Sequence, residues 1–337
     1  MTGIYRPRVK LAVASSFEGI VNNGATECAL TSFNAYAQMP EGRGKFFGYV
    51  IEPKDFATIR NSEHVAGFLA LRPLVGMAED YVTVLEVLEA CPAEVRHMLN
   101  HPDEESAYRP LIDLFQALKN NAWHAEKRKK FGTGEDSAFY RERKRMKDAD
   151  MTAWMGTQEP YADSVAQFRM LVDTQERVEG AANAYEAVTR GFVPWFATSK
   201  DVPSTFLLCQ IYTKTYGLDP GTVSEDGRRV CVISRDRIIG REEFPDVEDK
   251  ILLRTKQLQW VAEKEDVRPV DVWRVEDMYS PKQNIALRDA GFPIQFVVPG
   301  YVFPFDLIKM KEDPNIRVLD RSNFAAQLGG LAEAWRC

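Results

Sequence analysis

Acidic side chains follow two apolar stretches in the second half of the chain, a position where carboxylates can bind metal ions or act as general bases. Asp236 follows the apolar run at 229–234, and Glu276 and Asp277 follow the run at 270–275. If these runs are neighbouring strands, Asp236 and Asp277 would converge as in a two-metal nuclease site. Acids are also common just past strands and in the first turn of helices, so a purely structural role stays open.

The stretch 190–203 combines an arginine, aromatic residues, two prolines and a polar Ser-Lys-Asp sequence. Such a composition does not fit one regular element throughout. It is compatible with a pocket-lining loop in which Arg190 binds an anion, Trp195 stacks on a ring and Asp201 serves as a catalytic carboxylate. Ordinary packing at the edge of the core accounts for the same residues.

Residues 119–147 hold ten lysines and arginines against four acidic residues, most of the cations falling in two runs, 127–130 and 141–145. Clustered cations release counterions from a phosphate backbone, and interleaved aromatic rings can stack on bases. This basic segment is therefore expected to contact nucleic acid. The residues expected to do so are Lys127, Arg128, Lys129, Lys130, Arg141, Arg143, Lys144 and Arg145.

The basic segment is also compatible with two roles that involve no nucleic acid. It can meet an acidic protein partner or a second copy of the chain, or it can be a solvated helical hairpin that balances an acidic body. The glycines at 132 and 134 would let two helices reverse direction. They do not form a phosphate loop, because the GxxxxGK[ST] pattern is missing and no buried strand precedes them.

Motifs for metal and cofactor binding are missing from the sequence. His97 and His101 have the spacing of two ligands on one helix face, but Pro102 follows directly and no HExxH pattern is present. No GxSxG elbow is found either. We therefore expect no metal site and no cofactor.

Composition favours a folded cytoplasmic protein. The 337 residues suffice for two domains, and the net charge of −6 argues against binding nucleic acid or anionic lipid over the whole surface. The polar N-terminus and the short apolar run at 11–14 do not fit a signal peptide. No stretch approaches the roughly 20 apolar residues of a membrane span. The five cysteines form no CxxC pair, which indicates reduced thiols.

Hydrophobic periodicity predicts an α+β protein: a mostly helical N-terminal and middle region with a short β unit, followed by a C-terminal layered α/β unit. Strands are expected at 8–14, 45–51, 229–234, 270–275 and 294–298, and residues 237–244 are expected to pair with 229–234 as a hairpin. The predicted units are a small β-containing unit (1–60), a mainly helical region with the basic segment (61–218) and an α/β unit (219–337).

Residues 190–309 resemble the second half of thymidylate synthases and phage pyrimidine hydroxymethylases. The resemblance rests on Arg190, Asp201, the expected helix at 205–216 and the Gly-Leu-Asp-Pro-Gly turn at 217–221. It continues near the C-terminus in a motif similar to GYxPxPxIK, which is carried by Gly300, Tyr301, Pro304, Ile308 and Lys309. The resemblance implies that Arg190 binds a nucleotide phosphate and that Asp201 reads the pyrimidine edge.

The departures from that family affect its chemistry. No Pro-Cys-His precedes Arg190, so the nucleophile is missing, and Cys231-Val232-Ile233 replaces the HxY motif. The first 150 residues show no likeness. A chain that kept the shell without the cysteine would bind a nucleotide without methylating it.

Three functions from different classes are compatible with these features. The first is a phage- or mobile-element-like protein of DNA or nucleotide metabolism that contacts nucleic acid through the basic segment and acts on a base or nucleotide. The second is a non-catalytic structural or assembly protein. The third is a small-molecule or nucleotide-modifying enzyme with a divergent pocket.

Overall fold

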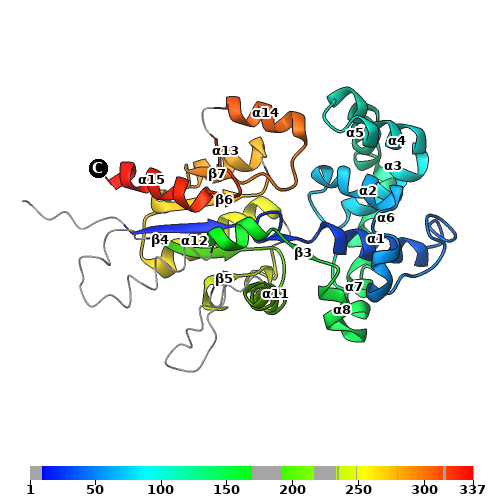
Figure 1. Ribbon diagram of the computed structural model, residues 1–337, viewed down its shortest axis with the longest axis horizontal. Helices are drawn as coiled ribbons and strands as arrows, with labels where there is room; N and C mark the ends of the chain where they lie inside the picture. The colour runs from blue at the N-terminus through cyan, green and yellow to red at the C-terminus, as the bar shows by residue number, and fades with distance from the viewer. Residues whose placement is uncertain are drawn as a thin grey trace, which may run out of the picture. The chain divides into compact units, whose positions relative to one another are not determined.

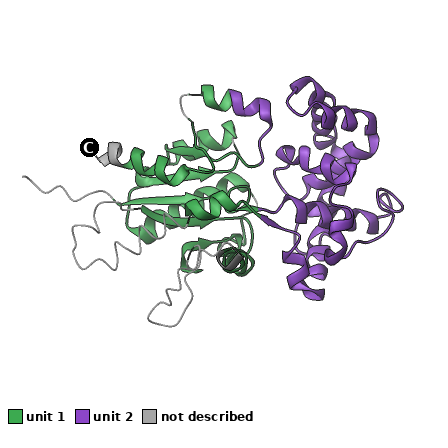
Figure 2. Ribbon diagram, viewed as in Figure 1, with its two compact units in different colours: residues 1–22, 160–300, 309–337 green, residues 23–159, 301–308 purple. Residues whose placement is uncertain are grey.

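The chain forms two compact units (Figure 2). The α/β unit comprises residues 1–22, 160–300 and 309–337, and the helical unit comprises residues 23–159 and 301–308. The computed structural model describes residues 10–168, 192–215, 233, 235–247, 249–278, 280–313 and 316–336.

The α/β unit is built on a six-stranded parallel sheet with the order β5-β4-β1-β6-β7-β8 (Figure 1). Each strand is short and mostly apolar. Ala14 of the central strand lies opposite Trp195 on one side and Arg274 on the other. The strands are β1 (Leu11–Ser15), β4 (Phe192–Ala197), β5 (Ile238–Ile239), β6 (Val272–Glu276), β7 (Gln295–Val297) and β8 (Arg317–Val318).

The first strand lies at the centre of the sheet because its LAVAS sequence is buried on both faces, as parallel interior strands require. From β1 the chain adds β4 and β5 on one side, then crosses over to add β6, β7 and β8 on the other. The direction of winding therefore reverses between β1 and β6. In doubly wound sheets this reversal marks the point where ligands bind, outside the carboxyl ends of the strands.

Helices cover the sheet. α12 packs against β1, β4 and β6, and Leu258, Val261, Leu287 and Phe292 form a core with the strands. α12 begins at a cap in which Asp249 accepts a hydrogen bond from the Leu252 amide. The helices are α11 (Val202–Thr215), α12 (Lys250–Glu265), α13 (Pro281–Asp289), α14 (Pro304–Glu312) and α15 (Phe324–Arg336).

The helical unit surrounds an aromatic core in which Tyr81 stacks on Phe68 and on Phe139. Its helices are α1 (Ala25–Gln38), α2 (Glu63–Ala70), α3 (Asp80–Ala90), α4 (Pro92–Asn100), α5 (Glu105–Lys119), α6 (Ala122–Gly132), α7 (Ala138–Ala149) and α8 (Met151–Met155). A two-stranded sheet of β2 (Asn22–Asn23) and β3 (Glu159–Pro160) lies where the chain passes between the units.

The predicted fold class is confirmed: a mostly helical region with a short two-stranded sheet, and then a layered α/β unit. α4 begins at Pro92, and Gly134 adopts a φ of +81° between α6 and α7, where the glycines were expected to let two helices reverse direction. The strand predicted at 45–51 is wrong. Residues 45–50 form turns with positive φ at Phe46 and Gly48, and the aromatic side chains pack edge-on against Phe33.

The two units divide the chain differently from the predicted bounds of 1–60, 61–218 and 219–337. β1 belongs to the α/β unit, because it pairs with β4 and β6 across a long helical insertion. The hairpin expected between 237–244 and 229–234 involves residues that, apart from 233, lie outside the described ones; within 237–244, β5 pairs in parallel with β4. Among the described residues, no helix is both long and apolar enough to cross a membrane.

Candidate functional site

Polar and charged side chains gather where β1, β4 and β6 end. Parallel strands end at the same edge of a sheet, so residues far apart in sequence meet there. α12 adds a cation from the helix that covers these strands. We call this set the strand-end cluster: Ser16, Glu18, Thr198, Lys200, Arg254, Glu276 and Asp277.

Ser16 and Glu276 form the centre of the cluster at the reversal between β1 and β6. The Ser16 amide bonds to the Val275 carbonyl at 2.8 Å, which continues the strand ladder and fixes the serine backbone. The Ser16 hydroxyl then donates to Glu276 Oε2 at 2.8 Å, joining residues 260 positions apart. A hydroxyl at a strand end, bonded to a carboxylate, is an arrangement that can take part in proton transfer.

Arg254 places a buried positive charge beside this pair. Its Nε donates to Glu276 Oε1 at 2.9 Å, and its Nη1 donates to the Ala197 carbonyl at 2.6 Å. Its Nη2 lies 3.5 Å from Ser16 Oγ. Both side chains of the Arg254–Glu276 pair are 7% exposed. Because a planar guanidinium carries several donors, Arg254 can bond to Glu276 on β6 and to the Ala197 carbonyl on β4 at the same time.

Lys200 and Glu18 form a second ion pair in the cluster. Lys200 Nζ lies 2.8 Å from Glu18 Oε1, and the lysine side chain is only 7% exposed. Asn22 donates to both Glu18 carboxylate oxygens at 3.0 Å, so the orientation of Glu18 is fixed. The Lys200 amide donates to the Thr198 hydroxyl at 3.0 Å, which turns the chain after β4.

Asp277 lies against the loop that follows β1. Gly19 has a φ of +77°, and a Cβ there would come within 2.5 Å of the Asp277 side chain. The Gly300 amide donates to the Asp277 carbonyl at 2.9 Å, and a Cβ on Gly300 would come within 2.1 Å of the Gly19 carbonyl oxygen. Only glycine fits at positions 19 and 300, because the segments that contain Gly19, Asp277 and Gly300 lie in close contact.

The cluster therefore combines two hydroxyls, two buried cations and three carboxylates. Lysine and arginine can bind an anion, and the hydroxyl bonded to a carboxylate can attack or donate a proton. Within the described parts of the chain, no three His, Cys, Asp or Glu side chains are grouped so that they could hold a metal ion.

The residues predicted in the 190–203 stretch fall in different places. Trp195 is buried in the core, where its indole donates to Glu265 at 2.9 Å and its ring packs edge-on against Trp260. Asp201 accepts a hydrogen bond from the Ser204 amide at 2.8 Å at the start of α11. Arg190 lies outside the described residues. The polar residues of the stretch that do join the cluster are Thr198 and Lys200.

Asp236 and Asp277 do not converge as the nuclease hypothesis requires. β4 and β1 lie between β5 and β6 in the sheet. Asp236 also precedes β5, whereas Asp277 follows β6, and in a parallel sheet these positions lie at opposite edges. The run at 229–234 lies, apart from residue 233, outside the described residues.

The basic segment supplies a buried ion pair to the core of the helical unit. Arg143 Nε and Nη2 donate to the two oxygens of Glu27 at 2.9 and 2.6 Å, and Glu27 is fully buried. Trp154 and Thr31 donate to the same carboxylate. Burial by itself lowers the pKa of the Arg143 guanidinium, but Glu27, together with Cys28 and Tyr140, outweighs burial and holds that pKa well above its ordinary value.

The first basic run pairs with acids on α3 and with Glu79, which directly precedes that helix. Arg128 Nη2 contacts Glu79 at 2.9 Å and Asp80 at 2.5 Å. Lys127 pairs with Glu86, and His124 contacts the same carboxylate. These cations are clustered in sequence because they neutralise a row of acids on the neighbouring helix.

Other cations of the segment make surface contacts. Lys130 pairs with Glu126 and Lys144 with Asp148, each one helical turn apart. Arg145 bridges Glu142 and Glu52, and Arg141 donates to the Asp136 carbonyl. Lys129 is exposed on α6. The exposed pairs Lys130–Glu126 and Lys144–Asp148 add about 0 to 1 kcal/mol each.

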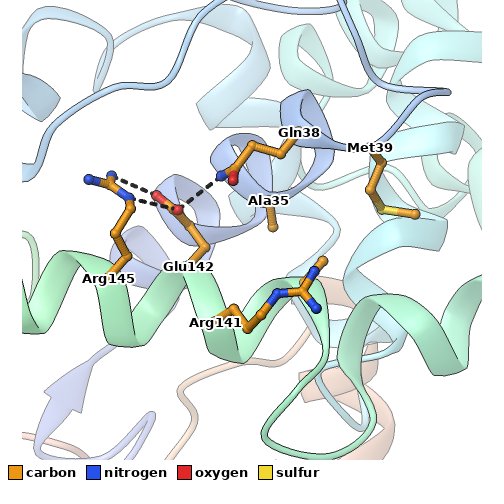
Figure 3. A pocket seen from close by; sticks show the side chains of 7 residues that line it. Ala35, Gln38, Met39, Arg141, Glu142 and Arg145 are labelled. Carbon is orange, nitrogen blue, oxygen red and sulfur yellow. Dashed lines mark hydrogen bonds and ion pairs between the residues drawn. The ribbon is translucent and has the colours of Figure 1, made fainter.

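A small pocket in the helical unit is the competing candidate site (Figure 3). Its volume is about 230 Å³, and its lining includes Gln38, Arg141, Glu142 and Arg145. Figure 3 shows Gln38 and Arg145 reaching the Glu142 carboxylate, which also accepts from Asn34. The buried acid is thus saturated by its neighbours, and the volume is below that of ordinary ligand pockets. The strand-end cluster is the better candidate.

Sequence reasoning identified Asp277 as a candidate but missed the partners that surround it. Ser16 and Glu18 directly follow the predicted first strand, and the strand-end rule used for the second half of the chain would have selected them. Arg254 gives no local signal, because it is one of several cations on an amphipathic helix.

Comparisons with known proteins identify similar solved structures. No family model matches the sequence, and no curated protein matches it. Two crystal structures of proteins assigned as phosphoglycolate phosphatases are similar. The one from Lactobacillus delbrueckii subsp. bulgaricus has a TM-score of 0.45 and 9% identity over 96% of this chain and 98% of its own. The one from Haemophilus somnus has a TM-score of 0.40 and 14% identity over 95% and 98%.

These findings correct the thymidylate synthase resemblance, which was wrong. The matched structures cover nearly the whole chain and are phosphatases by name. The described residues behind the resemblance also serve local packing. Asp201 caps α11 in the α/β unit, whereas Tyr301 lies in the helical unit and accepts a hydrogen bond from the Gly24 amide.

The interpretation as a DNA-binding, DNA-modifying transferase of phage-like DNA or nucleotide metabolism is wrong for the same reason. Its physical basis is also weakened, because Lys127, Arg128 and Arg143 are engaged by carboxylates of the helical unit itself.

Proposed function

We propose that this chain is a small-molecule phosphohydrolase that binds a phosphate ester at the strand-end cluster. The observation that carries the proposal is the Ser16 hydroxyl, bonded to Glu276 and flanked by Arg254 at the reversal point of the parallel sheet. Ligands of doubly wound sheets bind at this point.

Phosphoryl transfer depends on positive charge placed around the phosphoryl oxygens and on a correctly positioned nucleophile. Arg254 and Lys200 supply two cations, and Lys200 is held close to the loop after β1 by Glu18. Their ion pairs keep both cations buried without a ligand. A bound phosphate would share these cations with the carboxylates.

Ser16 is the proposed nucleophile. Its Oγ would attack phosphorus and form a new O–P bond while the P–O bond to the alcohol breaks, and its proton would pass to Glu276. Glu276 would then return the proton to the departing alcohol. Water would attack the phosphoserine, break the Ser16 O–P bond and release phosphate, and the serine hydroxyl would be restored.

A substrate panel tests this proposal. The full chain is incubated with sugar phosphates, nucleotides and carboxylic acid phosphates, including the phosphoglycolate in the names of the matched proteins, and phosphate release is measured. We expect release from at least one class, and stabilisation of the chain against heat by the same compounds.

Variants make the test specific to the site. Ser16→Ala should abolish release while heat stabilisation by the ligand persists, and Arg254→Met should weaken both. Arg288→Met changes an exposed arginine on α13 and is the matched control. Failure of every phosphate ester to bind or release phosphate would refute the proposal, as would full activity in Ser16→Ala.

Two further expectations belong to this proposal. A cytoplasmic location fits a small-molecule enzyme with reduced thiols, and cell fractionation checks it. A protein partner or self-association of the chain also stays a prediction. Light scattering at micromolar concentration checks that prediction, and a persistent monomer would count against self-association.

A further inference from the structure

Arg321 connects several loops near the strand-end cluster. It lies in the turn between β8 and α15, and its side chain reaches backbone carbonyls of distant segments. Nη1 donates to the Ile20 carbonyl at 2.6 Å and to the Ser164 hydroxyl at 3.0 Å. Nη2 donates to the Gly19 carbonyl at 2.8 Å and also to the Pro299 carbonyl.

The Tyr161 ring completes this arrangement. The Arg321 guanidinium carbon lies 3.8 Å from the centre of the ring, a cation–π contact. Tyr161 is itself fixed, because its amide donates to the Val21 carbonyl at 2.9 Å. One planar group thus satisfies acceptors in three segments, which only the several donors of an arginine can do.

The segments that Arg321 joins carry or support the strand-end cluster. Gly19 and Ile20 continue the loop that bears Ser16 and Glu18. Pro299 precedes Gly300, whose close approach to Gly19 holds Asp277 in place. Without the guanidinium, the Gly19 and Ile20 carbonyls would lose a charged donor, and unpaired buried acceptors are costly.

We propose that Arg321 is a positioning residue for the strand-end cluster. It acts through the backbone at Gly19 and Ile20, and so sets where the Ser16 hydroxyl and the Glu18 carboxylate lie. It also fixes Tyr161 and Ser164, which follow β3 where the chain returns from the helical unit. The consequence for catalysis rests on the proposed function, whereas the consequence for the loop does not.

Hydrogen–deuterium exchange tests the effect on the loop without an activity assay. In Arg321→Met, the protected amides of Gly19, Val21 and Gly300 should exchange about tenfold faster, while α12 keeps its protection. Arg321→Lys should give an intermediate effect, since an ammonium donates to fewer of the acceptors. Arg288→Met is the matched control and should leave exchange unchanged. Unchanged exchange of the loop, or an equal rise across the whole α/β unit, would overturn the proposal.

Kinetics test the effect on the reaction. Arg321→Met should lower kcat by about tenfold or more with a smaller change in KM, and Arg321→Lys should recover part of kcat. A loss of activity that merely follows the loss of folded protein would contradict a positioning role. If the natural chain hydrolyses no phosphate ester, the proposed function fails, and the exchange result alone still decides the role of Arg321.

Discussion

Glu276 is held through both carboxylate oxygens in the strand-end cluster, since it accepts from Ser16 and is ion-paired with a buried arginine. Glu276→Gln should destabilise the fold by about 3 to 5 kcal/mol, because removing one partner leaves the Arg254 charge buried and uncompensated. Denaturant unfolding measures this free energy.

A double substitution provides the control. In Arg254→Met with Glu276→Leu no buried charge remains from this pair, so much of the lost stability should return. Equal unfolding free energies for Glu276→Gln and the natural chain would show that the pair is not buried as described.

Asp80 links the basic segment to the stability of the helical unit. Burial raises the pKa of its carboxyl, but the Lys119 ammonium, the Gly76 amide and Arg128 together outweigh burial and lower that pKa below its usual value. A lowered pKa in the folded state contributes stability above the unfolded pKa of about 3.9, and this stability is lost as pH falls through the folded value.

Asp80→Asn should therefore destabilise the chain at pH 7, and the difference from the natural chain should shrink as the pH falls below about 4. Thermal unfolding at a series of pH values measures this. A difference that stays constant down to strongly acidic pH would mean that the charge of Asp80 does not stabilise the fold.

At the scale of elements, the loop after β1 depends on glycine. Gly19→Ala should destabilise the chain by more than Gly134→Ala, although both positions have positive φ. At Gly134 a Cβ would meet open space, so the cost is the backbone strain of about 1 to 2 kcal/mol. At Gly19 the Cβ would also collide with Asp277. Unfolding free energies decide this, and equal losses would contradict the close approach.

The cations of the basic segment should fall into two groups that differ in how much they stabilise the fold. Arg143→Met removes the partner of a fully buried carboxylate and should lower the thermal midpoint strongly. Lys144→Met removes an exposed pair on the same helix and should change it little. Similar midpoints for the two variants would mean that Arg143 is not part of the core.

Local elements could be predicted because their signals are local. The start of α4 at Pro92, the reversal at Gly134 and strands β1, β6 and β7 follow from residue type and short-range periodicity. The turn at residues 45–50 misled the prediction, since its aromatic residues suit a strand but instead pack on α1. The ion pairs of the basic segment could not be predicted, because their acidic partners lie on other helices.

For the whole molecule, the site depends on the order of strands in the sheet. Sequence patterns could select Asp277 and, by the strand-end rule, Ser16, but not the fact that they lie at the same edge of the sheet, since that follows from β1 pairing with β6 across a helical insertion. The predicted convergence of Asp236 and Asp277 was wrong for the same reason, because the sequence does not show the order of the strands in the sheet.

Two compact units with separate cores should unfold in two transitions. Phe131→Ala, in the helical unit, and Leu258→Ala, in the α/β unit, each remove a fully buried side chain and should cost about 2 to 5 kcal/mol. Calorimetry should show that each variant shifts a different transition. A single transition, shifted alike by both variants, would mean that the units unfold as one body.

Phosphate binding at the strand-end cluster can be located residue by residue. Inorganic phosphate is titrated into the isotope-labelled chain, and the amide resonances are followed by nuclear magnetic resonance. Saturable shifts are expected at Ser16, Glu18, Lys200 and Glu276, with weaker binding in Arg254→Met. Shifts at the helical-unit pocket instead, or no saturable shift at the strand-end cluster, would refute phosphate binding at this site.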